Sequence, residues 1–320
     1  MHQFELRQIQ AVDAALAARR PLLVRGDPGT GKSQLARAAA KELERAFISH
    51  TVDARTESRD LLWHFDAVSR LAEAQLMGAL HRSSAPANAG ARSENTVASK
   101  QQEINERLAI KRFLHPRALW WAFDWEGALQ QAQVAGLPSP PQPDGGDPSN
   151  GCLVLIDEID KGEPDVPNGL LEALGAGRFT PQGWDEPVTA KGDIAPLVII
   201  TTNEERALPD AFVRRCLVLH LRLPDDGEEL TLLLMARGRA HFIDLKVSDQ
   251  VLEAAAALLI ADRAHAKENN WRPLPGQAEY LDLLRVVTTR KETPKAQKDL
   301  LKDVGEFMLK KHLDAYQNSL

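Results

Sequence analysis

Residues 26–33 read Gly-Asp-Pro-Gly-Thr-Gly-Lys-Ser, the G-x-x-x-x-G-K-S pattern of a phosphate-binding loop. An apolar run, LLV at 22–24, precedes the loop, and a helical stretch follows it; a chance glycine-rich turn would lack these flanks. The glycines let the backbone turn inward, so that N–H groups and a helix N-terminus face the phosphates. Lys32 is expected to reach the β- and γ-phosphates, and the Ser33 hydroxyl to bind Mg²⁺. The residues expected to contact ATP are Gly26, Asp27, Pro28, Gly29, Thr30, Gly31, Lys32, Ser33 and Gln34.

The composition fits an α/β protein with a second, smaller domain. The chain has 320 residues, of which 43% are hydrophobic, and a net charge of −6. The acidic balance argues against a broad nucleic-acid surface, although not against a local basic channel. Cys152 and Cys216 each lie beside an apolar run, so we expect buried, reduced thiols of an intracellular protein. Neither a signal core nor an apolar stretch of membrane-spanning length is evident, so we expect a soluble cytoplasmic protein.

Strand and helix signals alternate in the first two thirds of the chain. Continuous Leu/Ile/Val runs are typical of a parallel sheet whose two faces are both covered by helices. The strands are expected at Leu22–Arg25, Ile48–Val52, Cys152–Ile156, Leu197–Thr201 and Leu217–Leu221. Helical spacing is found at 4–19, 33–46 and 166–175. This alternation predicts a doubly wound α/β domain with a five-stranded parallel sheet.

About a hundred residues separate the second and third strands, far more than a crossover requires. Helices are expected at Arg59–Leu80 and Gln101–Phe113, with a polar segment at 82–100 that we expect to be mobile and a Pro/Gly loop at 137–150. After Pro224 the apolar positions follow helical spacing at 230–237, 250–261, 278–287 and 300–316. We therefore expect a nucleotide-binding domain over 1–224 and an α-helical domain over 225–320.

The stretch CLVLIDEID at 152–160 is the second strong signal. It puts Asp157 at the carboxyl end of a buried strand, where open α/β sheets bind ligands. Asp157 is expected to hold Mg²⁺ opposite Ser33, and Glu158 to activate a water molecule as a general base. The alternative is an ordinary acidic start of a helix. Its position downstream of a phosphate loop favours the catalytic interpretation.

Two further signals follow. PLVIITTNEE at 196–205 places Asn203 after another buried strand, where its amide is expected to bind the attacking water and the γ-phosphate. Arg214 and Arg215 precede the last strand, and an arginine presented to a neighbouring subunit's phosphate stabilises transition-state charge. Arg215 is our first choice for that role. The alternatives are an ordinary turn asparagine and a solvated arginine pair.

These motifs, in this order, resemble those of AAA+ ATPases, and within them the MoxR-like, dynein-related branch. The resemblance rests on LVRGDPGTGKSQLARA, LIDEIDKGEPDVPNGLLEAL and TTNEERALPDAFVRRC, and it covers nearly the whole chain. It implies a sheet in the order 5-1-4-3-2, a helical lid and ATP at the subunit interfaces of a homo-oligomeric ring, commonly a hexamer. The long segment at about 56–150 resembles the branch's helix-2 insert. Residues 178–193 resemble its pre-sensor hairpin.

Two positions depart from the branch. A lid arginine, which the branch often has in a Pro-Arg motif, has no direct counterpart in RPLPGQAEY (272–280), where Gln277 stands near the expected place. Arg272 is the candidate to replace it at the nucleotide. Cys216 stands where a phenylalanine commonly follows the arginine pair, which changes packing more than chemistry.

Aromatic residues in the insert have two interpretations. Trp63, His64 and Phe65 lie near where pore loops occur in this architecture, but packing against the core is favoured. Packing is also favoured for Trp120, Trp121, Phe123 and Trp125, because no basic residues interleave them as in a base-stacking surface.

The resemblance implies an Mg²⁺-dependent ATPase that remodels a partner protein. Members of the branch often act with a von Willebrand A domain protein or in bacterial conflict systems. The main alternative is a nucleotide-switched scaffold that hydrolyses slowly and signals through its assembly state. A DNA-acting motor and a small-molecule kinase are disfavoured, the first by the acidic balance and the second by the pairing of Asp157-Glu158 with Asn203.

Overall fold

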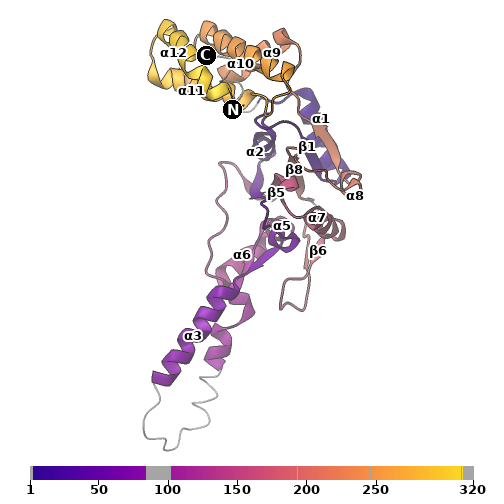
Figure 1. Cartoon of the computed structure of the whole chain (residues 1–320). Coiled ribbons are helices and arrows are strands. Elements are labelled where there is room, and N and C mark those ends of the chain that lie inside the picture. Colours follow the sequence, from indigo (N-terminus) through magenta and orange to yellow (C-terminus); the bar gives the residue numbers. More distant parts are fainter. Residues whose placement is uncertain (1–2, 84–101, 193, 246, 311, 313–320) are drawn as a thin grey trace, which may run out of the picture.

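The computed structural model describes residues 3–83, 102–192, 194–245, 247–310 and 312. Figure 1 shows three parts in a row: a helical group that contains α9 to α12, a central α/β part, and an arm that contains α3. The phosphate-binding loop lies between the first two parts, because β1 ends and α2 begins beside the helical group.

A five-stranded parallel sheet forms the centre. Its strands are β1 (Leu22–Arg25), β2 (Arg45–Thr51), β5 (Asp147–Asp157), β8 (Leu197–Thr202) and β9 (Leu217–His220). They are arranged β9-β1-β8-β5-β2, which is the expected order 5-1-4-3-2 when these five are counted along the chain. The labels differ from that count because β3, β4, β6 and β7 form two separate two-stranded sheets.

Register decides which polar residues meet at the carboxyl edge of the sheet. β5 and β8 pair in register from Leu153 with Leu197 to Ile156 with Ile200. Asp157 and Thr201 come one residue later on their strands, and so they end side by side. The expected strands are therefore confirmed, and their common edge assembles the candidate site.

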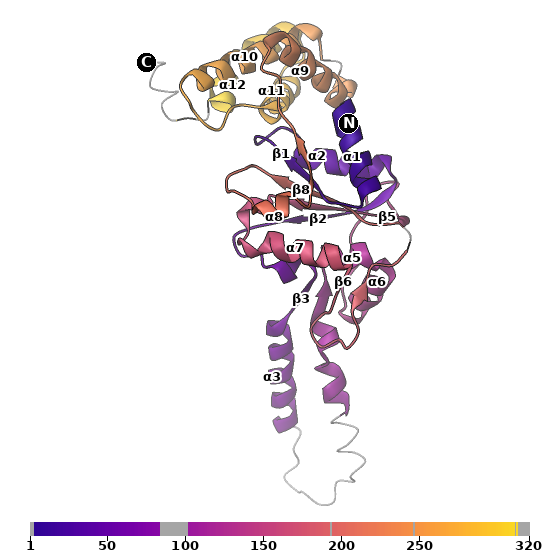
Figure 2. The ribbon, with the colours of Figure 1, turned by 90° about the vertical axis from the view of Figure 1, so that its right-hand side faces the viewer.

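Helices cover both faces of the sheet (Figure 2). α1 (Leu6–Ala18) and α2 (Lys32–Glu42) lie on one face, and α5 (Ala118–Phe123) and α7 (Asp165–Ala176) on the other. Successive residues of β5 accordingly enter different cores: Leu153 and Leu155 join the cluster under α1 and α2, and Val154 and Ile156 join the opposite one. Burial on both faces is why this strand reads as a continuous apolar run.

The insert between β2 and β5 differs from the expectation. Instead of a helix from Arg59, the chain forms η1 (Ser58–Leu61), β3 (Trp63–Phe65) and then α3 (Ala67–Ser83). β3 pairs antiparallel with β4 (Leu114–Pro116), which lies about fifty residues later. Two strands of three residues so far apart leave no periodic signal, and so the prediction over 59–66 was wrong.

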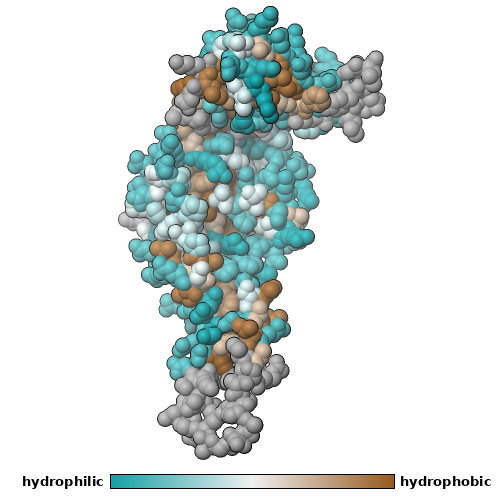
Figure 3. All heavy atoms as spheres, turned by 90° about the vertical axis from the view of Figure 1, so that its left-hand side faces the viewer, coloured by the Kyte–Doolittle hydropathy of each residue, from teal (hydrophilic) through white to brown (hydrophobic). Residues whose placement is uncertain are grey.

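The rest of the insert is helical and then extended. A helix over 102–107 and η2 (Ile110–Phe113) replace the single helix expected at Gln101–Phe113, and α6 (Trp125–Val134) was not predicted. β5 begins at Asp147, so the expected loop ends four residues early. From residue 84 on, the polar segment 82–100 lies outside the described residues. On the face in Figure 3, brown apolar patches lie among hydrophilic ones, and α3 exposes Val68, Leu71 and Leu76.

The aromatic residues pack, as favoured. Trp120, Trp121 and Phe123 are buried in the core beneath α5, with Trp125 packed against them. Trp63 stacks on Phe179 at 5.9 Å between ring centroids. Phe65 also packs against this core, whereas His64 is exposed.

Three smaller elements complete the α/β part. β6 (Arg178–Phe179) and β7 (Val188–Thr189) form the expected hairpin. η3 (Ile159–Lys161) follows the acidic strand end, and α8 (Asp210–Val213) precedes the arginine pair. Cys152 and Cys216 are both buried and free, as expected. No helix in the described part of the chain has the length and apolar character needed to cross a membrane.

Four helices follow β9. They are α9 (Gly227–His241), α10 (Asp249–Glu268), α11 (Gln277–Arg290) and α12 (Pro294–Leu309), with η4 (Ile243–Leu245) after the first. They share a core of their own, around Leu234, Leu259 and Tyr280. The last helix begins before the predicted 300–316 and ends at Leu309. We call this group of helices the lid; the domain division after residue 224 stays a prediction.

Candidate functional site

The phosphate-binding loop joins β1 to α2 through a backbone that requires glycine. Gly29 and Gly31 have φ angles of 76° and 94°, in the left-handed region, and Gly31 is the N-cap of α2. A Cβ on Gly26, whose φ is 155°, would lie 2.2 Å from the Leu221 carbonyl oxygen. The loop can therefore fold tightly around the helix N-terminus, which is where phosphates bind.

Lys32 points back into this loop. Its Nζ donates to the carbonyl oxygens of Gly26 at 2.7 Å and Asp27 at 2.9 Å, and the residue is 7% exposed. Burial lowers the pKa of the Lys32 ammonium, and the carboxylates of Asp157 and Asp27 oppose that shift. A phosphate oxygen is a stronger acceptor for this ammonium than two neutral carbonyls are.

Ser33 and Asp157 meet across the loop and the sheet. The Ser33 Oγ lies 2.9 Å from both carboxylate oxygens of Asp157, and the Thr201 hydroxyl donates to Asp157 Oδ1 at 2.5 Å. The Thr201 Oγ1 also accepts the Glu158 N–H at 2.9 Å. A hydroxyl and a carboxylate held together are the hard oxygen ligands that Mg²⁺ prefers, so these residues fit that ion.

Glu158 is held from two sides. Its Oε1 accepts from the Asn203 amide at 3.1 Å, and its Oε2 lies 2.8 Å from the Lys161 Nζ. The hydrogen bond to Glu158 raises the pKa of Lys161. Glu158 itself has left-handed backbone angles, φ 60° and ψ 49°, which are unfavourable for a residue with a side chain. The surrounding contacts thus fix the carboxylate where the two strands end.

These side chains border one cavity of about 930 Å³ between the sheet edge, α2 and the lid helix α11. Nine of the residues expected in the site line it: Pro28, Gly29, Gly31, Lys32, Ser33, Gln34, Asp157, Glu158 and Asn203. Thr30 instead faces a smaller cavity of about 310 Å³ on the other side of the loop. The larger cavity is of a size that accepts a nucleotide-sized ligand.

Comparison with known families decides the classification. Residues 21–216 match the model of the AAA domain, dynein-related subfamily. The chain belongs to this AAA family. The matched region runs from the residue before β1 to the residue before β9, and so it contains the phosphate loop, both polar strand ends and the arginine pair.

Among solved structures, one from Cytophaga hutchinsonii ATCC 33406, whose description proposes an ATPase, is 13% identical to the chain. The alignment covers 98% of this chain and 84% of that one, with a TM-score of 0.39. No curated protein matched the chain.

The two arginines of the AAA domain that precede β9 lie outside this cavity. Arg214 and Arg215 are exposed at the end of α8, and Arg20 donates to both of their carbonyl oxygens, at 3.0 Å in the case of Arg215. Their main chain is thus anchored to α1's end while their guanidinium groups face solvent. Neither side chain lines the nucleotide-sized cavity of its own chain.

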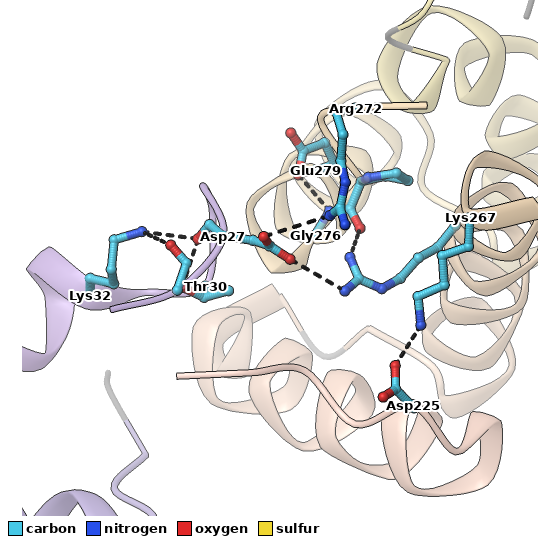
Figure 4. Close-up of polar contacts among 11 residues, drawn as sticks. Asp27, Thr30, Lys32, Asp225, Lys267, Arg272, Gly276 and Glu279 are labelled. Carbon is cyan, nitrogen blue, oxygen red and sulfur yellow. Dashed lines mark hydrogen bonds and ion pairs between the residues drawn. The ribbon is translucent and has the colours of Figure 1, made fainter. Parts of the chain in front are cut away.

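Arg272 does not reach the cavity either. Its side chain is 69% exposed, and its Nη1 lies 3.8 Å from the Asp27 carboxylate. Figure 4 shows Arg272, in the segment between α10 and α11, directed toward the Asp27 carboxylate of the phosphate loop, and Arg272 does not line the cavity. Gln277, which stands at the start of α11, does line the cavity.

The lid places two arginines near the site that sequence reasoning missed: Arg285 in the cavity wall, and Arg237 against Gln277 of that wall. Arg237 on α9 donates to the Gln277 side chain and forms an ion pair with Glu5 at 2.8 Å; burial lowers its pKa, and Glu5 opposes the shift. Arg285 on α11 lines the cavity and pairs with Asp282. In the sequence both look like the polar positions of amphipathic helices, and no motif distinguishes them.

Proposed function

We propose that this AAA protein is a cytoplasmic, Mg²⁺-dependent ATPase that assembles into a homo-oligomeric ring, most simply a hexamer, and remodels a partner protein. The observation that carries the hydrolytic part is the meeting of Ser33–Asp157 with Glu158–Asn203 in one cavity beside Lys32. A nucleotide-binding protein without turnover has no need for a carboxylate and an amide at that edge.

The residues divide the work by position. The loop backbone and Lys32 would bind the phosphates, and Ser33 with Asp157 would hold Mg²⁺, which supplies charge neutralisation at the β- and γ-phosphates. Glu158 would accept a proton from the attacking water, and the Asn203 amide would orient that water and the γ-phosphate. Gln277 and Arg285 line the opposite wall, where they would contact the nucleotide from the lid side.

The ring is supported by the exposed arginine pair. Because Arg214 and Arg215 lie outside their own cavity, an arginine contribution to phosphate transfer would have to act on the neighbouring subunit. Mixing Arg215→Ala subunits with Lys32→Ala subunits tests this. ATPase activity should recover partly at mixed interfaces; no recovery in confirmed mixed assemblies would exclude action in trans.

The alternative is a nucleotide-switched scaffold or signalling ATPase, as in bacterial conflict systems. The ion pair between Lys161 and Glu158 favours it, because the ammonium occupies the Oε2 face of the carboxylate that an attacking water molecule would otherwise approach. The Glu158→Gln variant separates the two proposals. Remodelling or biological output that survives complete loss of turnover would support the scaffold.

The proposed remodelling requires a protein client, which can be isolated with the chain. Affinity isolation of Glu158→Gln in ATP should trap a protein partner, with a von Willebrand A domain protein as one candidate. Recovery of the chain alone would count against remodelling. Salt-sensitive, tight binding to single- or double-stranded DNA would instead revive the disfavoured DNA-acting motor.

A further inference from the structure

Asp27 lies in the phosphate loop and faces two ways. Its carbonyl oxygen accepts from the Lys32 Nζ and from the Thr30 hydroxyl, each at 2.9 Å. Its carboxylate points out of the loop toward the lid (Figure 4). One residue thus contacts both the lysine expected to bind phosphate and the lid.

The lid supplies two cations to that carboxylate. Arg263 of α10 approaches Asp27 Oδ2 at 3.7 Å through its Nη2, and Arg272 approaches Oδ1 at 3.8 Å through its Nη1. The side chain of Arg263 is 8% exposed, and its Nη1 also donates to the Pro275 carbonyl oxygen at 2.9 Å. Arg263 therefore connects α10 to the segment that leads to α11.

The charges make Asp27 the natural partner of this pair. Burial lowers the pKa of Arg263, Asp27 and Asp225 oppose that shift, and Arg272 adds to it. The Asp225 carboxylate forms an ion pair with the Lys267 ammonium, as Figure 4 shows. Without the Asp27 carboxylate, two guanidinium groups would face each other with one of them buried, which is unfavourable.

The loop and the lid also touch directly. A Cβ on Gly29 would lie 3.2 Å from the Cβ of Ala278, and one on Gly276 would lie 3.4 Å from the Pro28 carbonyl oxygen. The Gly276 N–H donates to Glu279 Oε2 at 2.9 Å, which caps the start of α11 at the place where it meets the loop. A movement of the loop at Asp27 therefore reaches α11, which forms one wall of the cavity.

From these contacts we propose that Asp27 is a positioning residue that fastens the lid to the phosphate loop and transmits phosphate binding to it. The fastening is a property of the chain without nucleotide. The transmission rests on the proposed function: when Lys32 turns from the Asp27 carbonyl to a phosphate, the loop segment that carries the carboxylate is released. Arg263 and Arg272 then follow it, and α11 moves over the cavity.

The test measures the distance between the lid and the α/β part in the full chain. Spin labels are placed on Glu172→Cys in α7 and Glu253→Cys in α10, both exposed, while the two native thiols are buried. Asp27→Asn keeps the shape of the side chain and removes its charge. Asp249→Asn is the matched control, because it removes an ion pair with Arg239 inside the lid, away from the loop.

Without nucleotide, Asp27→Asn should broaden the distance distribution about twofold, and Asp249→Asn should leave it unchanged. Adding a non-hydrolysable ATP analogue should shift the distance in the parent chain, and Asp27→Asn should lose most of that shift. If Asp27→Asn folds poorly, Arg272→Gln removes the exposed partner alone and should give a smaller change of the same kind.

Outcomes for the two proposals are separable. Distances and nucleotide response equal to those of the parent chain in both Asp27→Asn and Arg272→Gln would overturn the fastening by Asp27, even if a fluorescent ATP analogue binds. Failure of the parent chain to bind that analogue would instead overturn the nucleotide-binding function and the transmission. Broadening by Asp27→Asn in the nucleotide-free chain would still support the fastening.

Discussion

Thr201→Val should uncouple the two polar strand ends without changing their shape. Thr201 is fully buried near the end of β8, and its hydroxyl makes two hydrogen bonds at the end of β5: it donates to Asp157 and accepts the Glu158 N–H. Valine has nearly the same volume and can do neither. Thr202→Val is the matched control, since Thr202 is 1% exposed and, among the residues that the structure describes, its hydroxyl bonds only to the N–H of the exposed Glu204.

The magnitude follows from these partners. A hydrogen bond to a charged group contributes about 1.5–3 kcal/mol, and a buried N–H left without an acceptor costs about 1–3 kcal/mol. Thr201→Val should therefore lower the free energy of unfolding by about 3–5 kcal/mol. Thr202→Val should lower it by about 1 kcal/mol, because water can reach the freed Glu204 N–H.

Urea unfolding followed by tryptophan fluorescence measures this difference. Five of the six tryptophans lie in the α/β part, at 63, 120, 121, 125 and 184, so the signal reports on the sheet. The midpoint should fall while the slope m stays the same. ATP turnover should also fall at least about tenfold in Thr201→Val, because each 1.4 kcal/mol of misplaced transition-state contact is about tenfold in rate.

Equal unfolding free energies for the two valine variants, within about 0.5 kcal/mol, would refute the reasoning on stability. Turnover of Thr201→Val at the parent rate would show separately that the position of Asp157 does not depend on this hydroxyl.

Three further predictions concern other sites. Gly26→Ala should abolish ATP binding in a fluorescence titration, because its Cβ would collide with the Leu221 carbonyl; parent-level binding would contradict the loop geometry. The control Gly78→Ala lies in α3 with open space around it, and it should stabilise the chain by about 0.5–1 kcal/mol in urea unfolding. Trp120→Ala should lower the free energy of unfolding by about 3–5 kcal/mol in the same assay. Trp120→Phe should lower it far less, because the buried indole N–H has no acceptor among the described residues; equal losses would show that the N–H is hydrogen-bonded. Burial raises the pKa of Cys152 from 9.0 to about 12, so iodoacetamide at pH 8 should alkylate this thiol about a thousandfold more slowly than in the unfolded chain. The thiol's contribution to the free energy of unfolding should be lost as the pH rises from 9 toward 12. Rapid alkylation in the folded state would contradict the burial.

The strands of the sheet and the residues that line the cavity could be predicted, because each leaves its signal within a short stretch of sequence. The central strands β1, β5 and β8 carry apolar runs because both of their faces are buried, and the polar site residues lie at or just after the ends of these runs. The order of the strands in the sheet could not be predicted from spacing alone. The family resemblance supplied it. The β3–β4 pair was missed because two three-residue strands separated by a long helical excursion carry no local signature.

Arg272 shows where sequence reasoning failed at the site. Its place near the start of α11 suggested contact with nucleotide, but the structure directs it to the carboxylate of Asp27. Arg237 was missed for the same reason, since its partner Glu5 is 232 residues away. Pairings of this kind depend on how the whole lid docks, which no short pattern encodes.

The sequence by itself determined the phosphate loop and the residues of the acidic strand end, because a phosphate cradle must be built from consecutive backbone groups and so occupies eight adjacent positions. Tertiary structure alone decided what that loop touches. The lid rests on Asp27 because many packing contacts among four helices set its position, and only then do Arg263 and Arg272 come within reach of the carboxylate.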